Sequence, residues 1–285
     1  MRASSARGAA LAVALGVVAL AACSTRTLVV VDPYPCPDGG GAACATGLLD
    51  GLVGYWRLAD PPGSATARDQ SGWGNDGALV GLDPTTAWVS GGPEGGALSV
   101  QGQGYLNVAD SPSIDSITDQ VTVAAWMYLD GTITDYATAI SRQIGTGYGQ
   151  HYHLSVTAQQ TPGLFITTTI GGQPDQLDIV GATTVPQQTW VHLAGTYDGA
   201  EARLYVDGVQ VVSGALSGPF AAETNPVVLA GNGNTASKTV SELVPGELDE
   251  ILLYRRALGA DEIARLAAGA LLPAGRLRDG GSPGN

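Results

Sequence analysis

Residues 189–212, TWVHLAGTYDGAEARLYVDGVQVV, carry the pattern that decides the fold of this chain. Apolar side chains alternate with others in short runs, and the dipeptides Asp198-Gly199 and Asp207-Gly208 separate these runs. Asp-Gly between alternating apolar runs is the strongest short-range signal for a β-hairpin. The stretch therefore predicts three antiparallel strands joined by tight turns.

Residues 245–266, PGELDEILLYRRALGADEIARL, follow after a polar loop. Residues 248–254 have the composition of a strand, and residues 260–266 keep a helical period. Acidic residues stand in the first turn of that helical segment, where they suit the helix dipole. We expect one more strand and then a single short helix.

The same kind of short apolar run recurs through residues 48–269, with Gly, Pro, Asn or Asp in nearly every gap. This spacing is typical of antiparallel sandwiches. The sequence predicts one all-β domain, a two-sheet antiparallel sandwich, in which Gly195 and the Ala124-Ala125 pair let the facing sheet approach closely. Strands are expected at residues 53–56, 105–108, 121–129, 137–141, 152–157, 164–170, 177–180, 190–197, 202–206, 227–230 and 248–254.

Five ordered segments resemble the LamG-like jelly-roll family, whose fold is that of concanavalin A-like lectins and glucanases. They are GLVGYWRLADPPGSATARDQSGWGNDGAL, ALSVQGQGYLNVADSPSIDSIT, VTVAAWMYL, WVHLAGTYDG with ARLYVDGV, and GELDEILLYRRALGADEI. The resemblance covers residues 51–266 and implies a jelly-roll sandwich. It does not fix the function, because this scaffold carries many activities.

The N-terminal segment, residues 1–22, is predicted to be a lipoprotein signal peptide. Arg2 and Arg7 precede an apolar stretch too short to span a bilayer, and the segment ends in Leu-Ala-Ala before Cys23. This resembles a bacterial lipobox, so we expect Cys23 to be lipidated and the protein to be anchored in the cell envelope, at the outer membrane and outside the cytoplasm. The alternative is an ordinary secretory signal that happens to meet a cysteine.

Residues 23–47 are predicted to be a Pro- and Gly-rich tether, and residues 270–285 a disordered tail. Cys36 and Cys44 lie close together in the tether, and an exported chain favours their pairing as a disulfide. Metal binding is the alternative, but two thiols without further ligands make a poor site.

The composition excludes one class of partner. The formal net charge is −13, and Lys238 is the only lysine. A nucleic-acid-binding protein needs clustered positive charge, so we expect no nucleic-acid partner. Contact with the membrane is expected through the lipid only.

The resemblance also implies a structural calcium ion, held by Asp69 and Asn75 of the DQSGWGND loop together with Asp249. Calcium takes six to eight oxygen ligands and tolerates irregular loops. The alternative is a loop held only by its own side-chain hydrogen bonds.

Tryptophan positions suggest two roles. Trp56, Trp126 and Trp190 lie inside predicted strands and are expected to be core residues. Trp73 and Trp88 are expected in Gly-rich loops, where an exposed indole can stack on a sugar ring, so they are the candidate ligand-binding residues.

Residues 247–250, Glu-Leu-Asp-Glu, invite a hydrolase interpretation. Strict alternation puts Glu247 and Asp249 on one face of a strand, but the next positions on that face are Ile251 and Leu253. Glucanases of this fold use a further Glu there, so the predicted protein is not an enzyme. His151 and His153 share a face and could share a metal, but edge-strand histidines without a third ligand are the simpler interpretation. His192 is expected in the core.

We therefore expect a lipid-anchored, non-catalytic recognition protein that binds a glycan through loops at the rim of the sandwich. The alternative is a structural or adhesive envelope protein that binds other proteins. A glycoside hydrolase of the same fold is the third possibility.

Overall fold

The computed structural model describes residues 47–145, 149–234 and 239–270. The predicted signal peptide, Cys23, Cys36, Cys44 and the tail from residue 271 onward lie outside the described residues.

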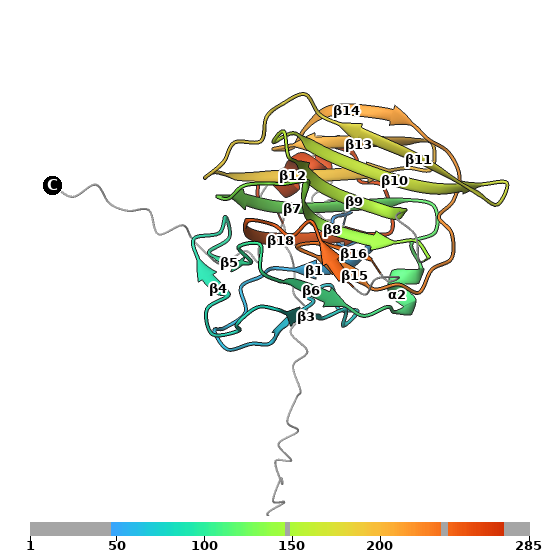
Figure 1. The fold of residues 1–285 in the computed structure, drawn as a ribbon. Coiled ribbons are helices and arrows are strands. Elements are labelled where there is room, and N and C mark those ends of the chain that lie inside the picture. The colour runs from blue at the N-terminus through green and yellow to red at the C-terminus, as the bar shows by residue number, and fades with distance from the viewer. Residues whose placement is uncertain (1–46, 146–148, 235–238, 271–285) are drawn as a thin grey trace, which may run out of the picture.

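Two eight-stranded antiparallel sheets face each other (Figure 1), so the predicted all-β sandwich is confirmed. Sheet A has the order β14 (Val209–Ala215), β13 (Glu201–Val206), β12 (Trp190–Tyr197), β7 (Val121–Leu129), β18 (Gly246–Tyr254), β5 (Gly96–Ser99) and β4 (Trp88–Ser90), with β1 (Leu52–Trp56) paired to β18. Sheet B has the order β11 (Gln173–Val180), β10 (Pro162–Ile170), β9 (Gln150–Thr157), β8 (Tyr136–Gln143), β15 (Val227–Leu229), β6 (Tyr105–Val108), β3 (Gly77–Val80) and β2 (Thr66–Ala67).

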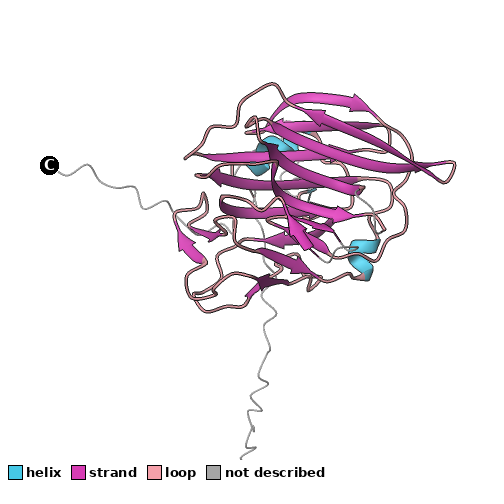
Figure 2. Ribbon diagram, viewed as in Figure 1, coloured by secondary structure: helices cyan, strands magenta, loops and turns pink. Residues whose placement is uncertain are grey.

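The remaining elements are few and short (Figure 2). Strands β16 (Asn232–Asn234) and β17 (Thr239–Ser241) form a small separate hairpin. Helix α2 (Pro112–Asp115) was not expected from the sequence, whereas helix α3 (Ala260–Ala267) is the predicted C-terminal helix.

No helix in the described part of the chain combines the length and the apolar character that crossing a membrane requires.

The main core lies between the two sheets. Alternate residues of β7, such as Val123, Ala125 and Met127, point into it from sheet A and are fully buried. Gly195 is the predicted point of close approach, because a Cβ atom there would lie 2.5 Å from the Cδ1 atom of Leu164 in sheet B. The predicted role of this glycine is confirmed. Ala125 also faces this core, but the prediction was wrong for Ala124, which lies on the outer face of sheet A.

A second apolar cluster covers part of the outer face of sheet A. It joins Ala124, Ala194, Leu252 and Tyr254 of that face to Ile263 and Leu266 of helix α3. Helix α3 therefore packs on the outside of the sandwich, where it closes one half of this face.

Trp126 and Trp190 correct one prediction. Trp56 is a core residue, with 0% of its surface exposed, but the other two are only partly buried and lie on the outer face of sheet A. The reason is that their strands are apolar on both faces, and alternation alone does not say which face is inside.

Candidate functional site

The half of the outer face of sheet A that helix α3 leaves uncovered carries two rows of functional side chains. Strand pairing places Trp190 beside Tyr128 and Tyr128 beside Glu247. The next row on the same face consists of His192, Trp126 and Asp249. Directly opposed residues on neighbouring strands have Cβ atoms about 4.5–5.5 Å apart, so the six side chains adjoin one another, and Asp249 is fully buried among them. We call these six residues the open face.

The aromatic rings of the open face contact one another. The Tyr128 and Trp190 ring centroids lie 5.6 Å apart, and the Trp126 ring meets His192 edge-on at 5.3 Å. Trp126, Tyr128 and Trp190 are each partly exposed. His192 is buried, but it lies on the outer face of sheet A beside Trp126 and not in the core between the sheets, where it was predicted. The site thus presents a partly accessible aromatic surface on rigid central strands.

The loop between β4 and β5 borders the open face. The Gly91 carbonyl oxygen accepts a hydrogen bond of 3.1 Å from Nε1 of Trp190, and the backbone N–H of Glu94 donates to Asp249 at 3.3 Å. Beside this loop lies a cavity of about 500 Å³, lined in part by Arg57, Asp60 and Glu94. A ligand on the aromatic rings would therefore have polar groups within reach along one side.

Strict alternation wrongly placed Ile251 and Leu253 on the face of Glu247 and Asp249, because both are core residues in the structure. A β-bulge interrupts the pairing of β18 with β7 between Asp249 and Leu252, and Glu250 has a φ of 49° there. Its carboxylate accepts hydrogen bonds from the Tyr55 hydroxyl and from Nε of Arg57, the latter at 3.2 Å. Glu250 also lines a small cavity of about 10 Å³ with Trp126 and His192, so it stands beside the open face rather than in the core.

Burial shifts the protonation of this region toward neutral groups. Burial and the nearby Glu250 carboxylate raise the pKa of Asp249 to about 8, although hydrogen bonds from two backbone N–H groups act in the opposite direction. Burial likewise raises the pKa of Glu250 to about 7 and that of Glu247 above its ordinary value. Burial lowers the pKa of His192 to about 4. Each environment therefore disfavours the charged form.

The predicted calcium ligands fall into two separate places. The Asp69 carboxylate accepts hydrogen bonds from the backbone N–H groups of Tyr55, Ser71 and Asn75, at 2.8–3.0 Å. Strand β1 runs between this loop and β18, because Trp56 bridges to Asp69 and also pairs with Ile251. Asp249 belongs to the open face on the far side of β1.

The side chain of Asn75 is also engaged. Its amide nitrogen donates to the Val53 carbonyl at 2.8 Å and to Ser113 Oγ at 2.9 Å, and its oxygen accepts from Ser111 Oγ at 2.7 Å. Among the described residues, no group of three or more His, Cys, Asp or Glu side chains could hold a metal ion. The donors therefore do not form one ligand set, and calcium binding stays a prediction, which the effect of a chelator on Tm would test.

The two predicted ligand-binding tryptophans differ. Trp73 is 53% exposed, its Nε1 donates to the Leu52 carbonyl, and Arg255 lies over its ring at 6.0 Å. Trp88 is only 7% exposed, forms part of strand β4, and donates to the Ser64 carbonyl. The expectation of an exposed loop position was wrong for Trp88, because the Gly-rich segment around it is a short edge hairpin.

The histidines of β9 are buried in different surroundings. His153 stacks on Phe165 at 4.9 Å, and its Nε2 lies 3.1 Å from the Glu242 carboxylate and 2.6 Å from the Thr138 hydroxyl. His151 packs against Phe220 at 5.2 Å. The predicted edge position of His151 and His153 was wrong, because β9 lies inside sheet B.

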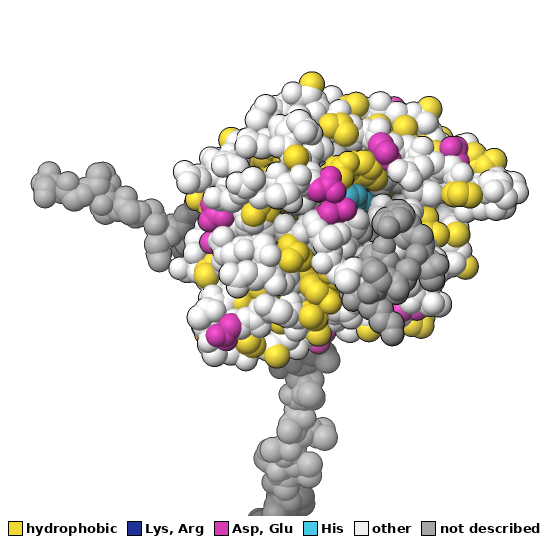
Figure 3. Space-filling view, viewed as in Figure 1, with side chains coloured by type: hydrophobic (Ala, Val, Ile, Leu, Met, Phe, Trp, Pro, Cys, Tyr) yellow, Lys and Arg dark blue, Asp and Glu magenta, His cyan; other side chains and the backbone are white. Residues whose placement is uncertain are grey.

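The face in Figure 3 carries a histidine and acidic side chains near its centre, among hydrophobic ones.

Sequence reasoning missed the open face as a binding surface, although a signal was present. Trp126 with Tyr128, and Trp190 with His192, are two residues apart on their strands and therefore share a face. Small residues, Ala124 and Ala194, follow on that face where helix α3 packs. What the sequence lacked was the information that the helix stops short of the aromatic rows.

Several solved structures have the same fold. The binding domain of Paraclostridial Mosquitocidal Protein 1 superposes with a TM-score of 0.57 at 17% identity, over 78% of this chain and 53% of that chain. Domain 4 of AbnA, an extracellular arabinanase from Geobacillus stearothermophilus, gives 0.52 at 19% identity, over 76% and 98%. Trypanosoma rangeli sialidase gives 0.55 at 16% identity, over 85% and 36%. This chain thus spans about half the length of the toxin binding domain.

No significant match was found among curated protein sequences. A family profile matches residues 100–264, which is more than half of the chain and includes the hairpins, the central strand and the open face. The chain belongs to the concanavalin A-like lectin/glucanases superfamily.

Proposed function

We propose that this chain is a non-catalytic, lipid-anchored glycan-binding protein of the cell envelope, and that the glycan lies on the open face. The observation that carries this proposal is the partly exposed set of Trp126, Tyr128 and Trp190 beside the carboxyl groups of Glu247 and Asp249. The site differs from the rim loops that the sequence suggested.

The chemistry of the open face suits a sugar. Aromatic rings supply a large apolar surface with polar edges, which matches the C–H face of a sugar ring. The carboxyl group of Glu247 and the Arg57 guanidinium are both partly exposed and can exchange hydrogen bonds with hydroxyl groups. Binding sites commonly combine an aromatic lining with a few polar groups that fix orientation.

Proteins of the same fold support a glycan ligand. Domain 4 of AbnA was solved in complex with arabinotriose, and the botulinum neurotoxin DC binding domain in complex with SialylT. The AbnA domain is covered over 98% of its length, so arabinotriose is the first probe to use.

The test is isothermal titration of the purified domain with arabinotriose and with a panel of neutral oligosaccharides. Trp190→Ala and Trp126→Ala are expected to weaken binding by at least tenfold, about 1.4 kcal/mol. Trp73→Ala is the matched control, because Trp73 is exposed but lies away from the open face. Binding that survives both open-face substitutions, or that is lost only in Trp73→Ala, would contradict the proposed site.

One observation favours glycoside hydrolysis as a second candidate. The β-bulge brings Glu250 beside Asp249, so the third carboxyl group that alternation denied is present. A carboxyl group with a pKa of about 7 suits a general acid. Release of reducing ends from arabinan or β-glucan, abolished by Glu247→Gln while binding is kept, would establish this activity. If micromolar protein releases no reducing ends, the hydrolase candidate is wrong and the binding function is the one that stays.

A further inference from the structure

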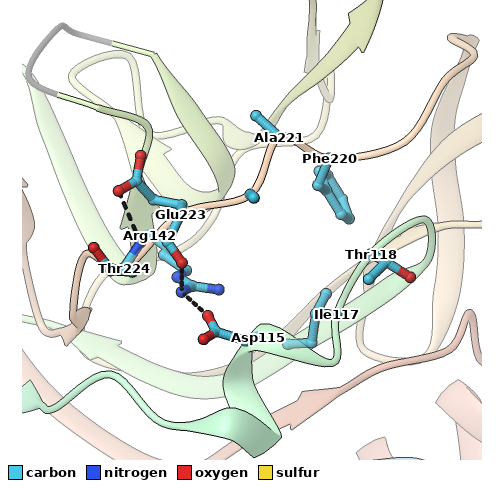
Figure 4. A pocket seen from close by; sticks show the side chains of 9 residues that line it. Asp115, Ile117, Thr118, Arg142, Phe220, Ala221, Glu223 and Thr224 are labelled. Atoms are coloured by element: carbon cyan, nitrogen blue, oxygen red, sulfur yellow. Dashed lines mark hydrogen bonds and ion pairs between the residues drawn. The ribbon is translucent and has the colours of Figure 1, made fainter.

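A second cavity lies at the rim of the sandwich, away from the open face, and has a volume of about 390 Å³ (Figure 4). We call it the rim cavity. Its wall is formed by Asp115, Ile117, Thr118, Arg142, Phe220, Ala221, Ala222, Glu223 and Thr224. We propose that the rim cavity is a second ligand site for a neutral, hydroxyl-bearing ring, such as one sugar residue.

Arg142 is the polar floor of the cavity and is almost fully buried. Its Nη2 donates to Asp110 at 2.8 Å, to Asp115 at 2.7 Å and to the Glu223 carbonyl at 2.8 Å. Its Nε donates to the Asn225 carbonyl at 3.2 Å. The guanidinium is therefore held rigidly, which lowers the entropic cost of using it for recognition.

One N–H group of this guanidinium has no hydrogen-bond partner within the described residues. The Nη1 nitrogen carries two N–H groups but makes one hydrogen bond within the described residues, to the Ile114 carbonyl at 3.3 Å. Figure 4 shows one end of the guanidinium directed toward Ile117 and Phe220, into the cavity. An acceptor atom of a ligand in the cavity can bind this N–H.

Asp115 supplies an acceptor next to that donor. Its side chain is 43% exposed, and it accepts the hydrogen bond from Arg142 through Oδ1. A donor and an acceptor side by side match two neighbouring hydroxyl groups of a sugar, one of which accepts from Arg142 while the other donates to Asp115. The exposed Thr118 and Thr224 add hydroxyl groups at the entrance.

The opposite wall is apolar. Ile117 and Phe220 are buried with one side on the cavity, and Phe220 is fixed between Tyr197 at 5.6 Å and His151 at 5.2 Å. Such a wall can receive the C–H face of a ring. The volume lies within the range of small-molecule sites, about 300–1,000 Å³.

The charges around the cavity argue against an anionic ligand. Three carboxyl groups, those of Asp110, Asp115 and Glu223, surround the single guanidinium of Arg142, so an anion would be repelled. A neutral ligand avoids this repulsion.

The test uses the full domain in a Trp126→Ala/Trp190→Ala background, so that the open face does not contribute. Saturation-transfer NMR with methyl α-glycosides of glucose, galactose, mannose and arabinose should detect saturable binding of at least one. Ala222→Trp fills the cavity from an exposed position and should abolish the signal. Asp115→Asn keeps an acceptor for Arg142 and should weaken binding by about tenfold, as for a lost hydrogen bond to a charged group.

Asp261→Asn, an exposed substitution on helix α3, is the matched control and should change nothing. No saturable binding of any of the four glycosides would overturn the proposal, as would binding that Ala222→Trp leaves intact. Because the open face is disabled in this background, either result is independent of whether the open face binds glycans.

Discussion

Trp56 and Trp190 differ in role because one faces the core between the sheets and the other faces outward. Trp56 is fully buried between the sheets, and its Nε1 donates to the Asn75 carbonyl at 2.8 Å. Trp190 lies on the outer face and remains partly exposed. The first is a determinant of stability, and the second is available for a ligand.

Trp56→Ala is therefore expected to lower the free energy of unfolding by about 3–5 kcal/mol, because it leaves a large cavity and an unpaired carbonyl. Trp190→Ala should cost much less, about 1 kcal/mol, as for other partly exposed positions. Urea denaturation followed by circular dichroism measures both. Equal losses would contradict the different placement of the two rings.

Asp249 makes the stability depend on pH in a specific direction. Its pKa rises from the ordinary 3.8 to about 8 in the folded protein, mainly through burial. The folded state therefore holds the proton more tightly than the unfolded state, and this contribution to stability falls as pH rises from about 4 to about 8. His192 acts oppositely: its pKa is lowered from 6.5 to about 4, so stability is lost as pH falls through that interval.

Asp249→Asn should remove the loss of stability that Asp249 causes at high pH. The free energy of unfolding of the variant, relative to the native protein, should increase with pH between 4 and 8 by up to about 1.4 kcal/mol per pH unit. Urea titrations at several pH values measure this difference. Parallel pH profiles for the two proteins would show that Asp249 is not protonated in this range.

Helix α3 is the element that divides the outer face of sheet A. Arg256 holds its first turn through two hydrogen bonds to Glu262, at 2.6 and 2.9 Å, and Glu262 accepts from the Gly259 backbone N–H. Ile263 and Leu266 then pack on the sheet. Gly208 allows this contact, because a Cβ atom there would lie 2.9 Å from the Ala264 backbone.

Ile263→Ala is expected to destabilise the domain by about 2–4 kcal/mol, since the residue is fully buried under the helix. The nearby exposed Asp261→Asn is the control. Thermal denaturation measures both, and hydrogen exchange of the Leu252 and Tyr254 amides reports whether the helix has detached. A normal Tm with rapid exchange would mean that α3 contributes little to global stability.

The strands were predictable to different degrees. Central strands such as β7 and β12 agree with the predicted residues, because long β-forming runs bounded by turn residues leave little choice. The short strands β2, β3, β4 and β5 were missed, since two to four residues give no sustained alternation. Helix α2 was also missed, although Ser111 caps it and Pro112 begins it.

The binding surface was less predictable than the fold. Which aromatic ring is exposed depends on where helix α3 ends and on how the β4–β5 loop folds back, and both are tertiary features. Glu250 illustrates the same limit, because a single bulge reverses the face that alternation assigns to it. The positions outside the described residues, Cys23, Cys36 and Cys44, stay predictions.

At the scale of the whole molecule, the net charge of −13 leaves the proposed lipid as the means of holding the protein at a membrane. Cys23→Ser is therefore expected to abolish labelling by radioactive palmitate and to move the protein from the membrane fraction to the soluble fraction. Cys36→Ser is the matched control and should remain membrane-bound. Membrane association of the Cys23→Ser protein would contradict the predicted anchor.

The way in which β1 joins the sheet has a mechanical consequence. Leu52 pairs with Tyr254 and Trp56 with Ile251, while Glu247 and Asp249 lie toward the other end of β18. Arg256 fastens the chain just before β1 by donating to the Gly47 and Asp50 carbonyls, at 2.6 and 2.8 Å. If tension acts between an N-terminal tether and a ligand on the open face, it runs along these two strands. Their hydrogen bonds lie across the strands and would be loaded in shear, all together, rather than opened one at a time.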